Sequence, residues 1–197
     1  MDFYADSSVA VLGFPPDAGY PRLTLAVLTE LGDLLNEVKL SGLFRGVVIA
    51  SNSRSFATGA RIEEVASLEG VGARAFAQKG QLIFNQIASF PLAVVAAIRG
   101  YCLGGGLDLA LACHARVATY DASVGHPGAS LGLITGWGGI QRLTRLIGRT
   151  AATQLLLTAE RVPATQALTL GLVDELLSSR DLVERAARRA RSRKTEI

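Results

Sequence analysis

Residues 92–106, with the sequence LAVVAAIRGYCLGGG, indicate the architecture of the chain most clearly. Its first seven residues are all apolar, which is typical of a strand buried on both faces of a parallel sheet. The glycines at 104–106 then open a helix that runs to about Cys113. A buried strand followed by a glycine turn and a helix predicts a βαβ unit.

The rest of the chain shows the same alternation of strands and helices. Short apolar runs predict strands at 9–14, 46–50, 115–119 and 172–176. Helical spacing, together with flanking glycine and proline, predicts helices at 24–38, 72–87, 140–147, 151–158, 162–170 and 182–191. The 197 residues contain no internal repeat and no linker, so they predict one α/β domain. We place its core at 1–178 and a basic C-terminal helix or tail at 179–197.

The composition excludes several classes of protein. Hydrophobic residues make up 49% of the chain and charged residues 19%, as in a packed globular protein. The two cysteines lack metal-ligand spacing, so we expect no metal site, no disulfide scaffold and a reducing compartment. The N-terminus has no signal-peptide pattern, and no apolar run reaches membrane-spanning length. We therefore expect a cytoplasmic protein with no membrane partner.

The positive charge is concentrated at the C-terminal end. The net charge is +3, but residues 180–197 alone carry seven Arg or Lys and three Asp or Glu. That balance of +4 leaves −1 for the other 179 residues. A basic segment can bind nucleic acid or anionic lipid, or it can be the solvated face of a helix. We favour the solvated face, and we expect no nucleic-acid partner.

The glycines at 104–106 also predict an anion-binding site. The first N–H groups of a helix have no intrahelical partner and lie at the positive end of its dipole. Glycine lets a ligand oxygen approach the backbone closely. Such a site suits an oxyanion that develops during a reaction. The alternative is that these glycines only allow a helix and a strand to pack closely.

Four segments together resemble one known family. The first three are SFATGARI (55–62), IRGYCLGGGLDLA (98–110) and GGIQRLTRLIG (138–148), and a fourth runs from LLLTA (155–159) to GLV (171–173). In order and spacing they resemble the crotonase, or enoyl-CoA hydratase/isomerase, superfamily, over roughly residues 9–176. The resemblance implies a crotonase-like ββα-superhelix core with stacked, mostly parallel sheets and flanking helices. The C-terminal helical part looks shortened.

The resemblance also implies a reaction and a set of partners. Family members bind an acyl-CoA thioester as substrate, need no cofactor and form homo-oligomers built on trimers. Two backbone N–H groups stabilise the thioester enolate, and here they map to Ala60 and Gly105. The implied substrate-binding positions are Ala57, Gly59, Arg61, Ile62, Tyr101, Gly104, Gly128 and Trp137. Arg61 either reaches a CoA phosphate or lies in solvent. Tyr101 and Trp137 either line the acyl pocket or fill the core.

The acid–base residues depart from the family pattern. Hydratases of the family use two carboxylates; the first position is Asp108 here, and the second is Gly128. Asp108 is either the acid–base group or a structural helix residue. His126 either reaches the pocket as a substitute or is a loop histidine bonded to the backbone. We therefore expect an enoyl-CoA hydratase/isomerase-like enzyme that is a poor hydratase, or alternatively a non-catalytic or weakly catalytic acyl-CoA-binding protein.

Overall fold

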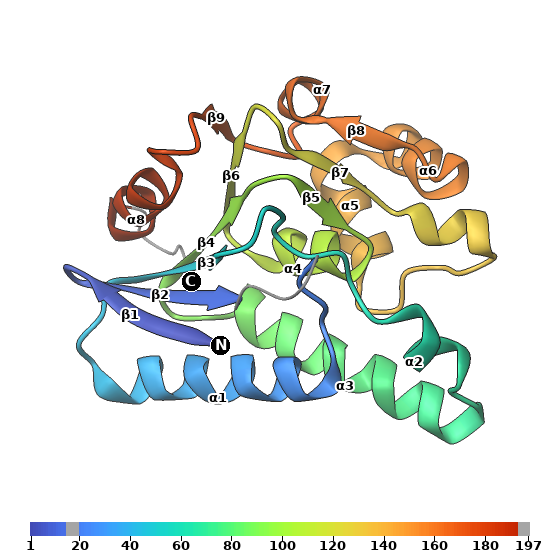
Figure 1. The fold of residues 1–197 in the computed structure, drawn as a ribbon, viewed down its shortest axis with the longest axis horizontal. Coiled ribbons are helices and arrows are strands. Elements are labelled where there is room, and N and C mark those ends of the chain that lie inside the picture. The colour runs from blue at the N-terminus through green and yellow to red at the C-terminus, as the bar shows by residue number, and fades with distance from the viewer. Residues whose placement is uncertain (15–19, 193–197) are drawn as a thin grey trace.

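A six-stranded sheet forms the centre of the protein, of which the computed structural model describes residues 1–14 and 20–192 (Figure 1). The spatial order of the strands is β1-β2-β3-β4-β6-β9. Their bounds are β1 (Asp2–Asp6), β2 (Val9–Phe14), β3 (Gly46–Ser51), β4 (Ala93–Ile98), β6 (Ala115–Thr119) and β9 (Glu175–Leu177). β1 pairs antiparallel with β2, and all other neighbours are parallel. The predicted α/β class with a mostly parallel sheet is confirmed.

Helices cover both faces of this sheet. Helices α1 (Leu25–Ser41) and α3 (Gly70–Ala88) pack on one face, and α8 (Leu182–Ser192) packs on the other. Successive side chains of a strand point to opposite faces. In β4, Val94 and Ala96 accordingly join the core beside α1 and α3, whereas Val95 and Ala97 join the core beside α8. This burial on both sides explains the unbroken apolar run at 92–98.

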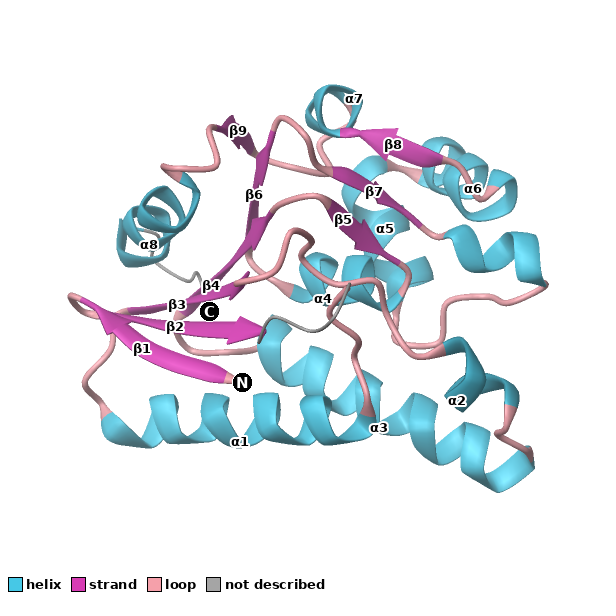
Figure 2. Cartoon of the chain, in the orientation of Figure 1, coloured by secondary structure: helices cyan, strands magenta, loops and turns pink. Residues whose placement is uncertain are grey.

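A second, three-stranded sheet lies beside the first (Figure 2). It contains β5 (Tyr101–Leu103), β7 (Ser123–Gly125) and β8 (Arg161–Pro163). Helix α4 (Gly105–Ala112) begins directly after β5, as the glycines predict. The remaining helices are α2 (Ile62–Ala66), α5 (Gly139–Ile147), α6 (Arg149–Thr158) and α7 (Ala164–Thr169), with a 3₁₀ helix η1 (Pro127–Leu131). Within the described residues, no helix is long and apolar enough to cross a membrane.

Helix α8 contains most of the basic C-terminal segment. Its buried face is small and apolar, with Leu182, Ala186 and Ala190 fully covered. Its arginines lie on the outer side, where Arg185 pairs with Glu175 at 2.9 Å and Arg189 with Asp174 at 3.6 Å. Residues 182–192 therefore share a core with the sheet. Residues 193–197 of the predicted tail lie outside the described part of the chain.

The differences from the predicted elements are local. The predicted helix at 162–170 is wrong at its start, because Val162 and Pro163 belong to strand β8 and the helix begins at Ala164. Proline has no backbone N–H to donate to a neighbouring strand, so it is tolerated at the end of a short edge strand such as β8. Strands β1, β5 and β7 were not predicted. The last two have three residues each, which is too short for a periodic pattern.

Candidate active site

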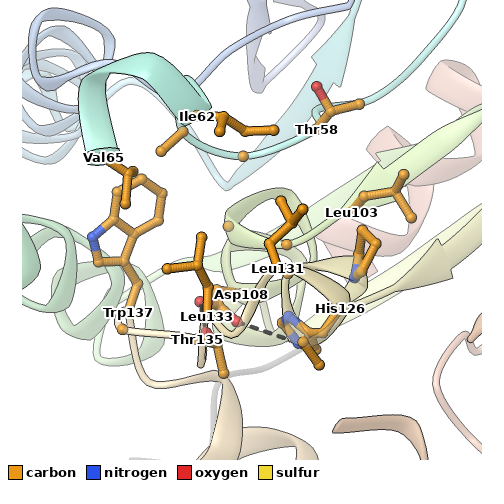
Figure 3. Close-up of a pocket in the computed structure, with 18 of the residues that line it drawn as sticks. Thr58, Ile62, Val65, Leu103, Asp108, His126, Leu131, Leu133, Thr135 and Trp137 are labelled. Carbon is orange, nitrogen blue, oxygen red and sulfur yellow. Dashed lines mark hydrogen bonds and ion pairs between the residues drawn. The ribbon is translucent and has the colours of Figure 1, made fainter. Parts of the chain in front are cut away.

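A cavity of about 620 Å³ opens where three glycine-rich segments meet (Figure 3). Residues 58–60 form one wall, the start of helix α4 forms the second, and the loop from His126 to Trp137 forms the third. Most of the lining side chains are apolar, including Ile62, Val65 and Leu133. Asp108 and His126 are the polar side chains that face each other within it.

Backbone hydrogen bonds hold the first wall against the second. The Ala57 N–H donates to the Tyr101 carbonyl at 3.2 Å, and the Leu103 N–H donates to the Ala57 carbonyl at 2.9 Å. Residue 57 thus pairs alongside β5 like an extra parallel strand. A Cβ on Gly106 would overlap the Ala57 carbonyl, so only glycine permits this approach. The pairing places residues 58–60 next to the first turn of α4.

Two backbone N–H groups remain unpaired at this junction. Gly59 has a φ of +84°, and a Cβ on it would lie 2.7 Å from the Gly105 nitrogen. Within the described residues, neither the Ala60 N–H nor the Gly105 N–H donates a hydrogen bond. Gly105 is the first residue of α4, so its N–H has no partner within the helix. Two free donors therefore lie on neighbouring backbones that line the cavity.

Asp108 lies one helical turn after Gly105 and is only 1% exposed. The Thr135 hydroxyl donates to Oδ2 of Asp108, and the Trp137 N–H faces the same carboxyl group. These contacts favour the ionised form, but burial outweighs them and raises the pKa of Asp108 to about 7. A carboxyl group with this pKa can both accept and return a proton near neutral pH.

His126 lies beside Asp108, at the point where β7 leads into η1. Its Nε2 atom is 3.4 Å from Oδ1 of Asp108, and its side chain is buried (Figure 3). Burial lowers the pKa of His126 to about 4. The short separation alone would suit an ion pair. Because burial disfavours both charges, we assign a neutral carboxyl group and a neutral imidazole between about pH 4 and pH 7.

The loop that positions Asp108 is anchored to helices α3 and α5. Gln81 of α3 donates to the Gly136 carbonyl at 2.7 Å, and Arg142 of α5 donates to the Trp137 carbonyl at 2.8 Å. The Trp137 ring packs against Phe76, with ring centroids 5.2 Å apart. These contacts fix residues 135–137, and with them the Thr135 hydroxyl that binds Asp108.

Gly128 is the position at which the resemblance predicts a second carboxylate. It lies in η1 and lines the cavity. A Cβ at Gly128 would lie 3.5 Å from the Leu133 Cβ, which is ordinary contact. Its backbone is not in the left-handed region that excludes larger side chains. The structure therefore has room for a side chain at this position.

Basic and aromatic side chains border another part of the cavity. Arg161 stacks over the Tyr101 ring at 5.5 Å, and the Tyr20 ring lies 5.7 Å from Tyr101. Arg22 lines the same region. Guanidinium groups and aromatic faces suit a ligand with both phosphate groups and a flat ring.

The structure brings most of the predicted site residues together. The cavity is lined by Gly59, Ala60, Ile62, Tyr101, Gly104, Gly105, Asp108, His126, Gly128 and Trp137. Ala57 is not among the lining residues, because it is buried and pairs with β5. Arg61 is exposed and precedes α2, outside the lining. Sequence reasoning missed Thr135, since nothing in a lone threonine indicates a contact with a residue 27 positions away.

Comparisons with known proteins point to one family. The family model described as enoyl-CoA hydratase/isomerase matches residues 7–196. The fatty acid oxidation complex subunit alpha of Shewanella sp. (strain ANA-3) is 41% identical over 165 residues, which are 82% of this chain and 23% of that protein. The chain thus spans less than a quarter of the length of the curated relatives it matches.

Solved structures match over nearly the whole chain. An enoyl-CoA hydratase from Bacillus anthracis superposes with a TM-score of 0.90 at 32% identity, covering 96% of this chain and 74% of that one. A second structure, from Geobacillus kaustophilus, gives a TM-score of 0.91 at 27% identity, covering 96% and 72%.

Proposed function

Because the chain belongs to the enoyl-CoA hydratase/isomerase family, we propose that it processes acyl-CoA thioesters through an enolate held by the N–H groups of Ala60 and Gly105. The observation that carries the proposal is the pair of unpaired donors on adjacent backbones of one cavity. In family members the thioester oxygen lies between two such groups. Each donor of this kind stabilises a developing oxyanion by about 3 kcal/mol.

Asp108 is the proton carrier in this proposal. It follows Gly105 by one helical turn, so a carbonyl bound at Gly105 has its α-carbon close to this side of the helix. Removing an α-proton requires an ionised carboxylate, and returning it requires the neutral acid. The pKa of Asp108, about 7, makes both forms available. A single carboxylate of this kind is enough for double-bond isomerisation.

The cavity border supports coenzyme A as the carrier of the acyl group. Arg22 and Arg161 supply positive charge, and Tyr20 and Tyr101 supply aromatic faces. The apolar lining around Val65 suits the acyl chain. A homo-oligomer built on a trimer belongs to the same proposal. Large apolar side chains that border the cavity, such as Leu131 and Ile134, stay exposed in the single chain.

One observation favours a second candidate function. Gly128 supplies no carboxylate, so the chain lacks one of the family's two acid–base side chains. This favours a weakly catalytic or non-catalytic acyl-CoA-binding protein. The two candidates differ in whether the bound thioester forms an enolate.

Exchange of α-protons separates them. The acyl chain of butyryl-CoA has no carbon–carbon double bond, so its α-protons exchange with D₂O only through the enolate. We expect NMR to detect enzyme-dependent exchange, together with saturable binding in calorimetry. Binding without exchange would favour the second candidate, and no binding at all would refute both.

A further inference from the structure

The position of His126 points to a chemistry that the missing carboxylate at Gly128 would otherwise exclude. We infer that Asp108 Oδ1 and His126 Nε2 together hold one oxygen atom of the reactant, either an attacking water or a 3-hydroxyl group. The chain then hydrates 2-enoyl-CoA thioesters, and the histidine takes the place of the second carboxylate. This inference rests on the proposed function, because the oxygen must lie beside a bound thioester.

Two buried polar atoms without partners carry the inference. Within the described residues, Oδ1 of Asp108 and Nε2 of His126 have no hydrogen-bond partner. Leaving a buried polar atom unsatisfied costs about 1–3 kcal/mol, so native proteins rarely tolerate two of them side by side. Both residues line the same cavity. A ligand atom that satisfies both is the simplest explanation of this pair.

The separation of the two atoms fits a bridging oxygen. They lie 3.4 Å apart, longer than the 2.7–2.9 Å of a typical charge-assisted bond. An oxygen about 2.8 Å from each atom completes a triangle with this side. The hydroxyl group of such a ligand donates one hydrogen bond to Nε2 of His126. Its oxygen accepts a second hydrogen bond from the neutral carboxyl group of Asp108. Water and a secondary hydroxyl group both meet this requirement.

The surrounding residues keep Oδ1 available for a ligand. The Thr135 hydroxyl occupies Oδ2, so only Oδ1 is left facing His126. A Cβ on Gly139 would overlap Oδ1, which means that the glycine at this position preserves the orientation of the carboxyl group. The backbone next to His126 is held in place because Gly125 of β7 pairs with Leu103 of β5.

Asp108 and His126 together supply the two proton transfers that hydration requires. The water oxygen bonds to C3 while His126 Nε2 takes one of its protons. The π electrons of the C2=C3 bond move to the thioester oxygen, between Ala60 and Gly105. The enolate then collapses, and C2 takes the proton of the neutral Asp108 carboxyl group. The imidazolium then returns a proton to the Asp108 carboxylate. Both side chains are therefore neutral at the start and at the end of the reaction.

The experiment compares two activities of the same site. Hydration of crotonyl-CoA needs the bound water, whereas α-proton exchange on butyryl-CoA needs only Asp108 and the two N–H donors. We expect His126→Asn to lower the ratio of hydration to exchange by about 100-fold or more, the usual contribution of an acid–base group. His126→Gln should do the same, and it serves as a second variant if the first folds poorly. His114→Asn is the matched control, since His114 lies outside the cavity lining and the ratio should not change.

A rescue variant completes the test. Adding Gly128→Glu to His126→Asn places a carboxylate where the structure has room, and it should restore hydration by at least about tenfold. A wild-type protein that exchanges α-protons but does not hydrate would overturn the inference and leave the proposed function intact. Equal losses of both activities in the two His126 variants would also overturn it. Absence of exchange in the wild type would instead refute the proposed function.

Discussion

Replacing one member of the Asp108–His126 pair should reveal a pH dependence of stability that the intact pair hides. Burial raises the pKa of Asp108 from 3.8 to about 7 and lowers that of His126 from 6.5 to about 4. Between these limits the folded protein holds one proton on Asp108, and the unfolded chain holds one proton on the histidine. Because both states bind the same number of protons, the pair gives no slope of stability against pH.

Each single substitution removes one of the two titrating groups, so the folded and unfolded states no longer bind the same number of protons. In His126→Asn, the unfolded Asp108 loses its proton near pH 4 and the folded one near pH 7, so stability falls as pH rises. In Asp108→Asn, the unfolded His126 takes up a proton below pH 6.5 and the folded one only below about pH 4, so stability rises with pH. Each slope is about 1.4 kcal/mol per pH unit. Between about pH 4.5 and pH 6, the first variant should lose about 2 kcal/mol and the second should gain about 2 kcal/mol.

Urea unfolding measures these slopes directly. Trp137 is the only tryptophan and is buried beside the site, so its fluorescence reports the transition. The wild type and the double variant Asp108→Asn/His126→Asn should show matching profiles, which makes the double variant the control. Parallel profiles for the wild type and both single variants would refute the reasoning. They would mean that the folded pair carries the same charges as the unfolded chain.

Three further predictions concern activity. Ala60→Pro removes one oxyanion donor and should slow α-proton exchange about 100-fold or more, with an unchanged circular dichroism spectrum; normal exchange in the folded variant would count against the donor assignment. Gly139→Ala would push the Asp108 carboxyl group aside, so exchange should fall at least about tenfold while calorimetry still detects thioester binding; full activity would contradict the packing of Oδ1 against Gly139. In the wild type, exchange should rise with pH through about 7, because only the ionised carboxylate accepts the α-proton, and hydration should fall over the same range, because it starts from the neutral acid. Rates that do not change across this range would show that Asp108 is not the titrating group.

The fold could be predicted because its strongest signals are local in sequence. The apolar run at 92–98 is typical of a strand that is buried on both faces, and the structure covers both faces of this strand. The glycines at 104–106 indicate a helix start, and α4 begins at Gly105. By contrast, β7 and β8 have three residues each and depend on partners from distant parts of the chain. A sequence pattern of that length carries no periodicity to detect.

The site was predictable only in part for the same reason. The proposed donors at Ala60 and Gly105 came from the resemblance of two glycine motifs to the family pattern. The contact between His126 and Asp108 joins residues from two elements, so the sequence left the role of His126 open. Thr135 and Gly139 act on Asp108 from the following loop and helix, and neither residue type indicates such a role by itself.

The proposed function requires that the N–H groups of Ala60 and Gly105 bind the carbonyl oxygen of an acyl-CoA thioester. A crystal structure with bound butyryl-CoA would give the distances from the thioester oxygen to the two backbone nitrogens. We predict that both distances are about 2.7–3.1 Å, with the α-carbon facing Asp108. A thioester oxygen that contacts neither nitrogen, or a ligand bound outside the cavity, would contradict the claim.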